Sequence, residues 1–500
     1  MRWELDWLEN RVRISPHAIA VVDGETGEQW TYLAVNERAK ALAFKLLSNG
    51  VEKGDRIALL SPNHICYFDL LFACGKIGAI FVPLNWRLSQ AEITYILQDC
   101  TPKLLAMHSS LINLIENNLF DHTIIINSNE YIKIVESENK EHSKEVMIED
   151  KDPLSIIYTG GTTGKPKGVV LTHQSMMWNG INTVISWNLT GNDVTLTYLP
   201  MFHTGGLNAL SIPILMIGGK VVIARDFRPT RAIELINKER CTIILMVPTM
   251  YHMIVGSDEF IDEEFPTMHT FLSGGAPCPL EIYQAFEKKG LSFKEGYGLT
   301  EAGPNNFFIN PEETLFRRGS VGKAMLFNQI KLIKDDGSEA GFDEVGEILI
   351  RGKHMFTHYW NNAKATNEVL VDGWLHTGDL ARQDRDGYHY IVGRKKEMII
   401  TGGENVYPLE VEHCIGEHSA VNEVAIVGLP DPKWGEMVAA FVSLKKNRSL
   451  TKEELTEHCL QTLGKYKVPR VIVFVEQLPK THVGKIDKKG LQKQYEHIVS

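Results

Sequence analysis

The sequence predicts an α/β fold: a large N-terminal domain of α/β layers, a small antiparallel β unit attached to it, and a small α+β C-terminal domain. Short β-branched runs alternate with longer amphipathic stretches as far as about Phe307, which is typical of a sheet with helices on its faces. Short strands separated by glycine-containing turns follow, and from about Lys395 strands mix with a helical pattern. We therefore expect one domain at 1–394 and a second at 395–500.

Four apolar runs are the clearest strands of the N-terminal domain. Each is short, rich in β-branched residues and flanked by helical periodicity: Arg56 to Pro62, Ala79 to Leu84, Lys220 to Ala224 and Thr242 to Val247. The segment from Glu136 to Asp152 is polar and charged, which is typical of a solvated surface loop.

Turn chemistry marks the antiparallel unit and the end of the chain. Asp335 to Gly341 and Arg385 to Tyr390 contain the Asp-Gly dipeptides of tight turns. Beyond them, Glu423 to Leu429 and Ala439 to Leu444 are predicted strands, and Thr451 to Leu463 has the spacing of a helix.

The composition is that of an ordinary globular protein. Hydrophobic residues make up 44% and charged residues 23% of the 500 residues, which excludes a disordered scaffold. Lys and Arg total 52 against 62 Asp and Glu, a formal net charge of −10. No nucleic acid partner is expected, because duplex binding rewards a basic face. A peripheral membrane contact and a homodimer stay open.

Cysteine usage and the first residues favour a reducing, cytoplasmic location. The seven cysteines are scattered and never spaced as CxxC, so neither a disulfide framework nor a zinc ribbon is supported. The opening MRWELDWLEN lacks the basic and apolar regions of a signal peptide. Proline, glycine and lysine interrupt the most apolar stretch, Leu210 to Ala224, so no membrane span is expected.

The strongest local motif is SIIYTGGTTGKPKGVVLTH, from Ser155 to His173. A predicted strand leads into a loop that offers a polyphosphate close backbone N–H groups, hydroxyl donors and compact positive charge. It is not a Walker A loop, because Pro166 stands where Ser or Thr is required. A flexible Gly/Thr hairpin is the alternative. The candidate phosphate-binding residues are Thr159, Gly160, Gly161, Thr162, Thr163, Gly164, Lys165 and Lys167.

This loop resembles the nucleotide-binding signature of the adenylate-forming superfamily, which contains acyl-CoA synthetases, nonribosomal adenylation domains and firefly-type luciferases. The resemblance continues in register from about Tyr32 to Leu491. The family usually has Ser at the position of Gly160, although some fatty-acid ligases also have Gly there. The fold expected from the resemblance is again a large N-terminal and a small C-terminal domain.

The next matching motif is GYGLTEAG, from Gly296 to Gly303. The resemblance implies that Tyr297 stacks on adenine, that Thr300 and Glu301 act on the phosphates in catalysis, and that Glu301 is the ligand of Mg²⁺. A carboxylate together with phosphate oxygens suits this hard cation. Without the family, YGLTE would be interpreted as an ordinary helix start with Thr300 near the cap.

Other segments complete the nucleotide site that the resemblance implies. SGGAP, from Ser273 to Pro277, resembles a turn whose backbone borders adenine and the acyl pocket. Asp379, in WLHTGDLA, is implied to accept both ribose hydroxyls, and Arg394 is implied to contact ribose and phosphate. The residues expected around adenine are Gly275, Ala276, Pro277, Gly296, Tyr297 and Gly298.

The C-terminal domain is implied to be mobile. Lys485, in LPKTHVGKIDKKGL, matches the catalytic lysine of the family, and Lys396 matches its interdomain hinge. Rotation about Lys396 is implied to remove Lys485 and to bring Gly402 and Gly403 to the site, where they leave a channel for pantetheine. Trp434, in DPKWGE, resembles a residue near bound CoA. Without the family, these lysines would be interpreted as solvated surface.

Three histidine or aspartate patterns have alternative explanations. His354 and His358 have i, i+4 spacing but lack a third ligand, so packing is expected rather than zinc. The segment Asp384 to Gly387 imitates the start of an EF-hand loop, yet the later acceptors are absent, so we expect a hairpin turn. His203, in PMFHTGG, aligns with a family position that lines the acyl pocket, and we assign it a substrate-facing catalytic role.

The resemblance implies an ATP-dependent, AMP-forming carboxylate:CoA ligase, with ATP and CoA as co-substrates, Mg²⁺ as the metal and a small carboxylic acid as the other substrate. A stand-alone adenylation domain is one alternative, but it would usually carry an Asp where this chain has Phe202 to Gly205. A noncatalytic nucleotide-binding protein is disfavoured, because Glu301, Asp379, Arg394 and Lys485 are all present. The motifs do not indicate the oxygenase chemistry of a luciferase.

The acyl pocket is the least determined part. Small residues at Gly205 and Gly206 are expected to let an acyl chain pass, and no Lys or Arg in the pocket segments pairs with a second carboxylate. A medium- or long-chain fatty acid is therefore favoured over an aryl acid. The candidate pocket residues are His203, Thr204, Gly205, Gly206, Pro248, Tyr251, Gly274 and the run Gly303 to Phe308.

Overall fold

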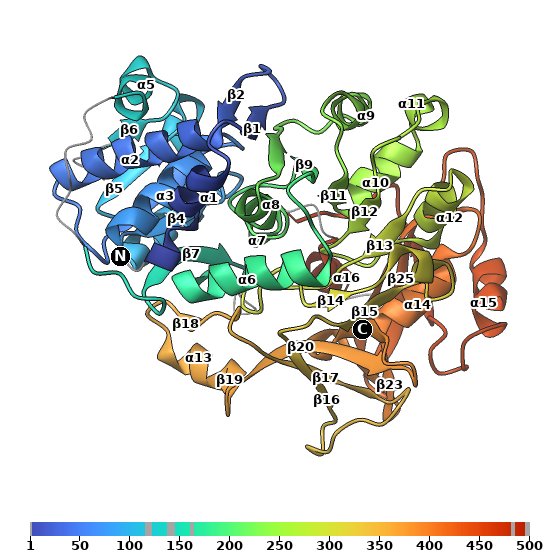
Figure 1. The fold of residues 1–500 in the computed structure, drawn as a ribbon. Coiled ribbons are helices and arrows are strands. Elements are labelled where there is room, and N and C mark those ends of the chain that lie inside the picture. The colour runs from blue at the N-terminus through green and yellow to red at the C-terminus, as the bar shows by residue number, and fades with distance from the viewer. Residues whose placement is uncertain (1–2, 116–122, 138–145, 161–164, 482–485, 496–500) are drawn as a thin grey trace.

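A computed structural model describes residues 3–115, 123–137, 146–160, 165–481 and 486–495. In Figure 1 the chain runs from a blue and cyan α/β layer, through a green layer, to yellow and orange antiparallel strands and an orange-red C-terminal part. The predicted α/β class is confirmed. No helix among these residues is long and apolar enough to cross a membrane.

The first layer is a seven-stranded sheet in the order β18-β8-β7-β4-β3-β5-β6. Its centre is parallel, and β8 and β18 add antiparallel strands at one edge. Buried on both faces, the central strands are almost wholly apolar. The strands are β3 (Arg56–Leu60), β4 (Ile80–Leu84), β5 (Leu104–Met107), β6 (Thr123–Ile125), β7 (Pro153–Thr159), β8 (Lys167–Thr172) and β18 (His358–Tyr359).

Helices cover this sheet, and side-chain caps fix several of their starts. Ser89 and Glu92 form a capping box at α4, and Thr172 and Ser175 form one at α6. The helical elements of this part are η1 (Trp3–Leu5), α1 (Trp7–Ile14), α2 (Tyr32–Ser48), α3 (Cys66–Ile77), α4 (Gln90–Cys100), η2 (Ser109–Leu114), α5 (Asn129–Val135) and α6 (His173–Ser186).

The second layer consists of a four-stranded sheet, β2-β1-β10-β9, and a parallel three-stranded sheet, β11-β12-β13. The strands are β1 (Ile19–Asp23), β2 (Gln29–Thr31), β9 (Val194–Thr197), β10 (Lys220–Ile223), β11 (Ile243–Met246), β12 (Thr270–Ser273) and β13 (Phe293–Glu295). The helices are α7 (Thr204–Leu207), α8 (Ser211–Ile217), α9 (Pro229–Lys238), α10 (Pro248–Val255), α11 (Asp258–Asp262) and α12 (Leu280–Lys288).

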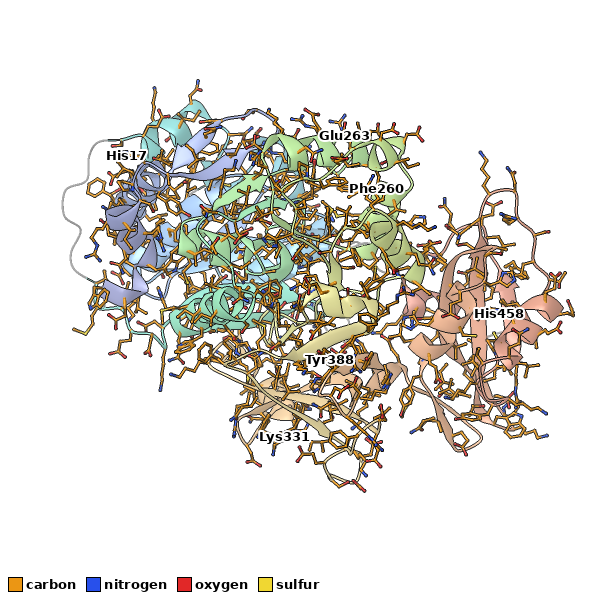
Figure 2. The ribbon with its side chains drawn as sticks, turned by 45° about the vertical axis from the view of Figure 1, so that its right-hand side comes forward. His17, Phe260, Glu263, Lys331, Tyr388 and His458 are labelled. Carbon is orange, nitrogen blue, oxygen red and sulfur yellow. The ribbon has the colours of Figure 1, made fainter. Side chains whose placement is uncertain are left out.

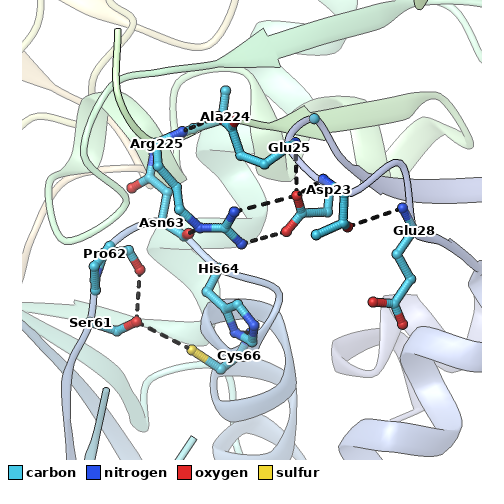
Figure 3. A network of polar contacts seen from close by, with 12 residues as sticks. Asp23, Glu25, Glu28, Ser61, Pro62, Asn63, His64, Cys66, Ala224 and Arg225 are labelled. Carbon is cyan, nitrogen blue, oxygen red and sulfur yellow. Dashed lines mark hydrogen bonds and ion pairs between the residues drawn. The ribbon is translucent and has the colours of Figure 1, made fainter. Parts of the chain in front are cut away.

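A polar network joins the two layers (Figure 3). The Arg225 guanidinium pairs with Asp23 and donates from Nε to the Asn63 carbonyl at 3.0 Å. The buried Asn63 amide donates to the carbonyls of Leu199 and Ala224, both at 3.0 Å, and accepts from the Met201 N–H at 2.8 Å. Asn63 therefore fixes the segment that leads to His203.

The antiparallel unit predicted after Phe307 is confirmed as a sheet in the order β14-β15-β21-β20-β17-β16, with β19 beside β20. Its strands are β14 (Phe307–Phe308), β15 (Ser320–Ala324), β16 (Gln329–Ile333), β17 (Val345–Arg351), β19 (Leu370–Val371), β20 (Trp374–Gln383) and β21 (His389–Arg394). The helical elements are η3 (Pro311–Leu315), α13 (Ala363–Val369) and η4 (Lys395–Glu397).

The C-terminal part has its own five-stranded sheet and its own apolar cores. Among the described residues, buried core members of this part begin at Ile399, whereas those of the preceding part end at Ala381. Figure 2 shows this part, marked by His458, beside the rest of the chain. Its elements are β22 (Ile399–Thr401), β23 (Glu404–Val406), α14 (Pro408–Gly416), β24 (Val421–Asp431), β25 (Gly435–Leu444), α15 (Lys452–Leu460), β26 (Val471–Phe474) and α16 (Lys488–Tyr495).

Glu281, on α12, links the two parts. Its carboxylate lies 2.8 Å from Lys445, which follows β25, and 3.3 Å from His252 on α10. Chiefly through hydrogen bonding to His252, the pKa of Glu281 falls to about 2. The link therefore keeps its negative charge at any neutral pH.

The sequence motifs with alternative explanations are also resolved. Asp384 accepts from the N–H groups of Asp386 and Tyr388, so the segment is the expected hairpin turn between β20 and β21. His354 is buried and lies 3.0 Å from the Asn306 amide oxygen, in agreement with packing. The described residues contain no cluster of three or more His, Cys, Asp or Glu side chains that could hold a metal ion. All seven cysteines are buried thiols without disulfides.

The stability of the first layer depends on a buried ion pair. Asp69 on α3 is fully buried, accepts two hydrogen bonds from Arg38 at 2.9 and 2.7 Å, and accepts a third from the Tyr131 hydroxyl at 2.8 Å. These contacts tie α2, α3 and α5 together.

We expect Asp69→Ala to destabilise the protein by about 3 to 5 kcal/mol, because it leaves a largely buried guanidinium without its partner. Calorimetric unfolding measures this. Lys334→Met is the control, since its pair with Glu344, at 3.2 Å, is exposed to solvent and contributes little to stability. Equal losses in the two variants would contradict the role of Asp69.

Candidate active site

The glycine-rich loop connects two neighbouring strands of the first sheet. β7 ends at Thr159, and β8 begins at Lys167. Among the described residues, no atom lies within 4 Å of a Cβ added at Gly160. Lys165 lies 5.5 Å from the centroid of Tyr95 and Lys167 5.0 Å from that of Tyr359. Of the predicted loop residues, Gly161, Thr162, Thr163 and Gly164 lie outside the described part.

Gly168 belongs to the same motif but is required for a different reason. A Cβ there would lie 2.8 Å from Ile156 and 3.1 Å from Trp360. Because these are core side chains, this glycine permits close strand packing rather than phosphate approach.

The GYGLTEAG motif forms a compact turn instead of the helix start that its local sequence resembles. Gly298 is enclosed by the turn, since an added Cβ would lie 2.1 Å from the Pro304 carbonyl oxygen. The Leu299 N–H donates to the Gly303 carbonyl at 3.2 Å, and the Asn306 N–H donates to the Tyr297 carbonyl at 3.1 Å. These bonds fix the turn between β13 and β14.

Three predicted nucleotide-binding residues meet at the Asp379 carboxylate. Tyr297 donates its hydroxyl proton to Asp379 Oδ2 at 2.6 Å, and Arg394 Nε lies 3.0 Å from Asp379 Oδ1. Asp379 and Arg394 face each other across β20 and β21. Asp379 is buried, whereas Arg394 is exposed. Burial, followed by the Asp379 charge, raises the pKa of Tyr297, so this phenol remains a donor.

Glu301 is the second carboxylate of the site. Its Oε1 accepts a hydrogen bond from the Tyr359 hydroxyl at 2.8 Å, and its carbonyl accepts one from the Phe356 N–H at 2.8 Å. Burial raises the pKa of Glu301, whereas the Tyr359 hydroxyl and the more distant Arg394 and Lys167 charges lower it. Thr300, beside it, is buried. The charged form of Glu301 is thus short of compensating positive charge.

Tyr359 is a residue of the candidate site that sequence reasoning missed. It lies on β18, which pairs with β8 beside Lys167, and it links Lys167 to Glu301. No motif marks it. Only the addition of a two-residue strand to the edge of the first sheet brings it to the site.

The turn after β12 contains the other residues predicted at adenine. Gly275 has φ +82°, and Gly275, Ala276 and Pro277 are exposed. The Gly296 N–H donates to the Ser273 carbonyl at 2.8 Å, which joins this turn to the start of GYGLTEAG.

The predicted acyl segment differs from expectation at Gly206. A Cβ at this position would lie 2.3 Å from the Pro200 carbonyl oxygen. Gly206 is therefore small because the backbone folds back on it, and the expectation that it leaves room for an acyl chain is wrong. His203 precedes α7 and packs on Phe202, with 4.6 Å between ring centroids.

The predicted CoA segments lie together in the C-terminal part. Gly402 has φ +61°, donates its N–H to the Trp434 carbonyl at 2.8 Å, and leaves room for the indole ring. The Arg470 guanidinium lies 4.4 Å from a ring centroid of Trp434. Lys396 is exposed in η4, two residues after Arg394. Lys485 lies outside the described residues.

Comparison with known proteins identifies the family of the chain. Residues 8–360 match the family described as AMP-binding enzyme, and residues 410–485 match the AMP-binding enzyme C-terminal domain. The chain belongs to this family. Its relatives place it in the acyl-CoA ligase branch of the adenylate-forming enzymes, as the resemblance predicted.

The relatives have similar lengths and different named substrates. The chain is 35% identical to a feruloyl-CoA synthase of Amycolatopsis, with 98% of each chain covered, and 35% identical to a long-chain-fatty-acid–CoA ligase of Mycobacterium tuberculosis, again with 98% of each covered. The solved o-succinylbenzoate coenzyme A synthetase of Bacillus subtilis with ATP and magnesium superimposes with a TM-score of 0.84, at 29% identity and 98% coverage of both chains.

The contact between Gly402 and Trp434 generates a prediction. In Gly402→Ala the new Cβ would lie 2.7 Å from the indole, and the positive φ adds about 1 to 2 kcal/mol of strain, so this variant should be destabilised by about 2 to 4 kcal/mol. Gly403→Ala is the matched control, since its φ is also positive, +87°, but no atom lies within 4 Å. Denaturant unfolding compares the two, and an equal effect would exclude steric conflict with Trp434.

Proposed function

We propose that the protein is an AMP-forming carboxylic acid:CoA ligase with two half-reactions. The meeting of Tyr297 and Arg394 at the Asp379 carboxylate carries the proposal. These residues come from three separated motifs, which are expected to contact adenine, the ribose, and the ribose with phosphate. Membership of the AMP-binding enzyme family supports the same chemistry.

In the first half-reaction, a carboxylate oxygen of the acid attacks the α-phosphorus of ATP. The bond to the β-phosphate oxygen breaks, and acyl-adenylate and pyrophosphate form. Asp379 accepts the ribose hydroxyls, Tyr297 lies against adenine, and Lys165 and Lys167 hold the leaving pyrophosphate. Lys485 donates to the oxygens on which negative charge develops. Catalysis then rests on positioning and on charge stabilisation.

Glu301 fits a magnesium ligand. Its carboxylate is short of positive charge, and one oxygen is already oriented by Tyr359. One carboxylate combined with phosphate oxygens and water is the donor set that Mg²⁺ prefers. The ion, when bound, supplies neutralisation of phosphate charge.

In the second half-reaction, the CoA thiol attacks the acyl carbonyl carbon, loses its proton and expels AMP, which gives acyl-CoA. We assign Gly402, Gly403 and Trp434 to the CoA side. The two domains would be residues 1–394 and 395–500, with Lys396 as the hinge. Between the two steps, the second domain would rotate, remove Lys485 from the site and bring these residues to it. The separate apolar cores of the two parts support this division.

An acid with an apolar body is the proposed substrate, and a medium- or long-chain fatty acid is the first to test. Aryl acids are the second choice, since the relatives include both a feruloyl-CoA synthase and a long-chain-fatty-acid ligase. Pyrophosphate release and CoA-dependent AMP formation with a panel of fatty and aromatic acids test the proposal. Pyrophosphate release without formation of a CoA thioester would favour a carrier-loading adenylation domain. If no acid gives pyrophosphate release, the ligase assignment is contradicted.

Lys485→Ala should abolish most acyl-adenylate formation and spare thioester formation. Loss of one electrostatic donor to developing charge costs about 3 kcal/mol, or roughly 10² to 10³ in rate. Pyrophosphate release measures the first step, and synthetic acyl-AMP with CoA isolates the second. Lys493→Ala, on α16, is the control and should change neither step. Equal loss in both half-reactions would remove Lys485 from its role.

Tyr359→Phe should weaken magnesium binding, because it removes the hydrogen bond that orients Glu301. Loss of a hydrogen bond to a carboxylate costs about 1.5 to 3 kcal/mol and raises the pKa of Glu301 further. The magnesium concentration for half-maximal adenylation should rise about tenfold or more, and the acid limb of the pH profile should move to higher pH. Tyr390→Phe, which loses a bond to Asp384, is the control. An unchanged magnesium requirement would contradict the link.

A further inference from the structure

The side chains of β13 alternate between two environments. Phe293 and Glu295 point toward α12, where Phe293 packs on Phe286 with 4.8 Å between centroids and Glu295 accepts from the Tyr283 hydroxyl at 2.6 Å. Successive side chains on a strand point to opposite faces. Lys294 therefore lies on the other face, the face of Gly296, where the turn of the active site begins.

Lys294 is a buried lysine held only by aromatic rings. It is 3% exposed, and its Nζ lies 4.4 Å from the centroid of Trp187 and 4.5 Å from that of Phe308. Within the described part of the chain, no oxygen accepts a hydrogen bond from this ammonium group. Burial alone lowers the pKa of Lys294 to about 7.

A second buried hydrogen-bond donor lies in the same part of the core. The Trp187 indole N–H, at the end of α6, is buried and has no hydrogen-bond partner among the described residues. Cation–π contacts offset only part of the cost of burying an unpaired ammonium group. Lys294 and Trp187 thus bring two buried hydrogen-bond donors to one part of the core, the ammonium group lying over the indole ring.

Lys294 lies close to segments that were predicted to line the acyl pocket, since its Nζ contacts Phe308. Phe308 ends the run predicted to line that pocket, and Gly296 begins the turn that carries Tyr297. Trp187, Leu272, Tyr297 and Phe308 share one apolar cluster. Since a strand rises about 3.3 Å per residue, Lys294 lies about 7 Å beyond Gly296 along β13. The pocket segments named from the sequence contain no Lys or Arg, and Lys294 lies outside them, on β13.

We propose that Lys294 and Trp187 form a distal anion subsite, and that the acid activated by this enzyme carries a second carboxylate at the far end of its apolar body. The proposal rests on the proposed function, since it describes the acid of the same reaction. One carboxyl group enters the acyl-adenylate, and the other remains ionised and pairs with Lys294. The aromatic rings of Trp187 and Phe308 then cover the apolar stem next to the ion pair.

Pairs of acids with equal carbon numbers test the subsite: adipic against hexanoic, suberic against octanoic, and dodecanedioic against dodecanoic acid. The wild type should use at least one diacid with kcat/KM at least tenfold above its monoacid. Lys294→Met, which keeps the length of the stem, should lower kcat/KM for that diacid about 30-fold or more and leave the monoacid equal or improved. Lys323→Met is the matched control, because Lys323 also contacts a ring, 4.5 Å from the Tyr388 centroid, but is exposed.

Trp187→Phe provides a second variant that keeps a ring beside Lys294 and removes only the indole N–H. It should show a smaller loss that is again selective for the diacid. Calorimetric binding of the diacid gives a readout without turnover: binding that Lys294→Met abolishes supports the subsite even if the ligase assignment fails. A tenfold preference for monoacids in the wild type, or equal losses for both acids in folded Lys294→Met, would overturn the subsite while leaving the ligase assignment intact.

Discussion

The candidate site depends on one carboxylate, Asp379, which two neighbours hold from different directions. The register of β20 and β21 places Arg394 directly opposite, and the Tyr297 hydroxyl reaches it from the turn after β13. A carboxylate that accepts from both sides fixes the antiparallel sheet, the turn and the chain segment leading into the C-terminal part at the same time. Since Asp379 is buried, water competes little for these bonds.

Much of the fold was predictable because its signals are local. Apolar runs gave the central strands correctly, and Asp-Gly turns gave the hairpins, since buried parallel strands and tight turns each impose a composition on a few consecutive residues. The conformation of the GYGLTEAG turn could not be predicted from local signals, because it depends on contacts with a sheet that is distant in the sequence. Gly206 and Gly168 show another limit: a glycine is recognisable in a sequence, but the atom that would collide with its missing side chain is not.

The site could be predicted where the chemistry lies in contiguous motifs, and it was missed where contacts join unrelated segments. Asp379 and Arg394 were named from motifs, and the structure brings them together with Tyr297. Tyr359 has no motif, since it reaches the site through a short edge strand, and the burial of Lys294 follows from the alternation of side chains along β13. Whether a lysine is a solvated surface group or a buried one depends on its neighbours in space, which spacing along the chain does not encode.

Two ionisable groups of opposite sign are destabilised in their charged forms, Lys294 on the strand before the GYGLTEAG turn and Glu301 within that turn. Burial raises the pKa of Glu301 and lowers that of Lys294. A ligand of opposite charge stabilises the charged form of each group. Part of the free energy of ligand binding therefore comes from removing the destabilisation that burial of the charge causes.

The contact of Glu281 with Lys445 and His252 has a consequence for the two parts of the chain that it joins. Its members are each at least one-third exposed, and exposed pairs of this kind contribute about 0.2 to 1 kcal/mol, close to thermal energy at 0.6 kcal/mol. At physiological ionic strength the Debye length is about 8 Å. Dissolved salt therefore weakens this contact, and the polar attraction between the two parts of the chain decreases as ionic strength rises.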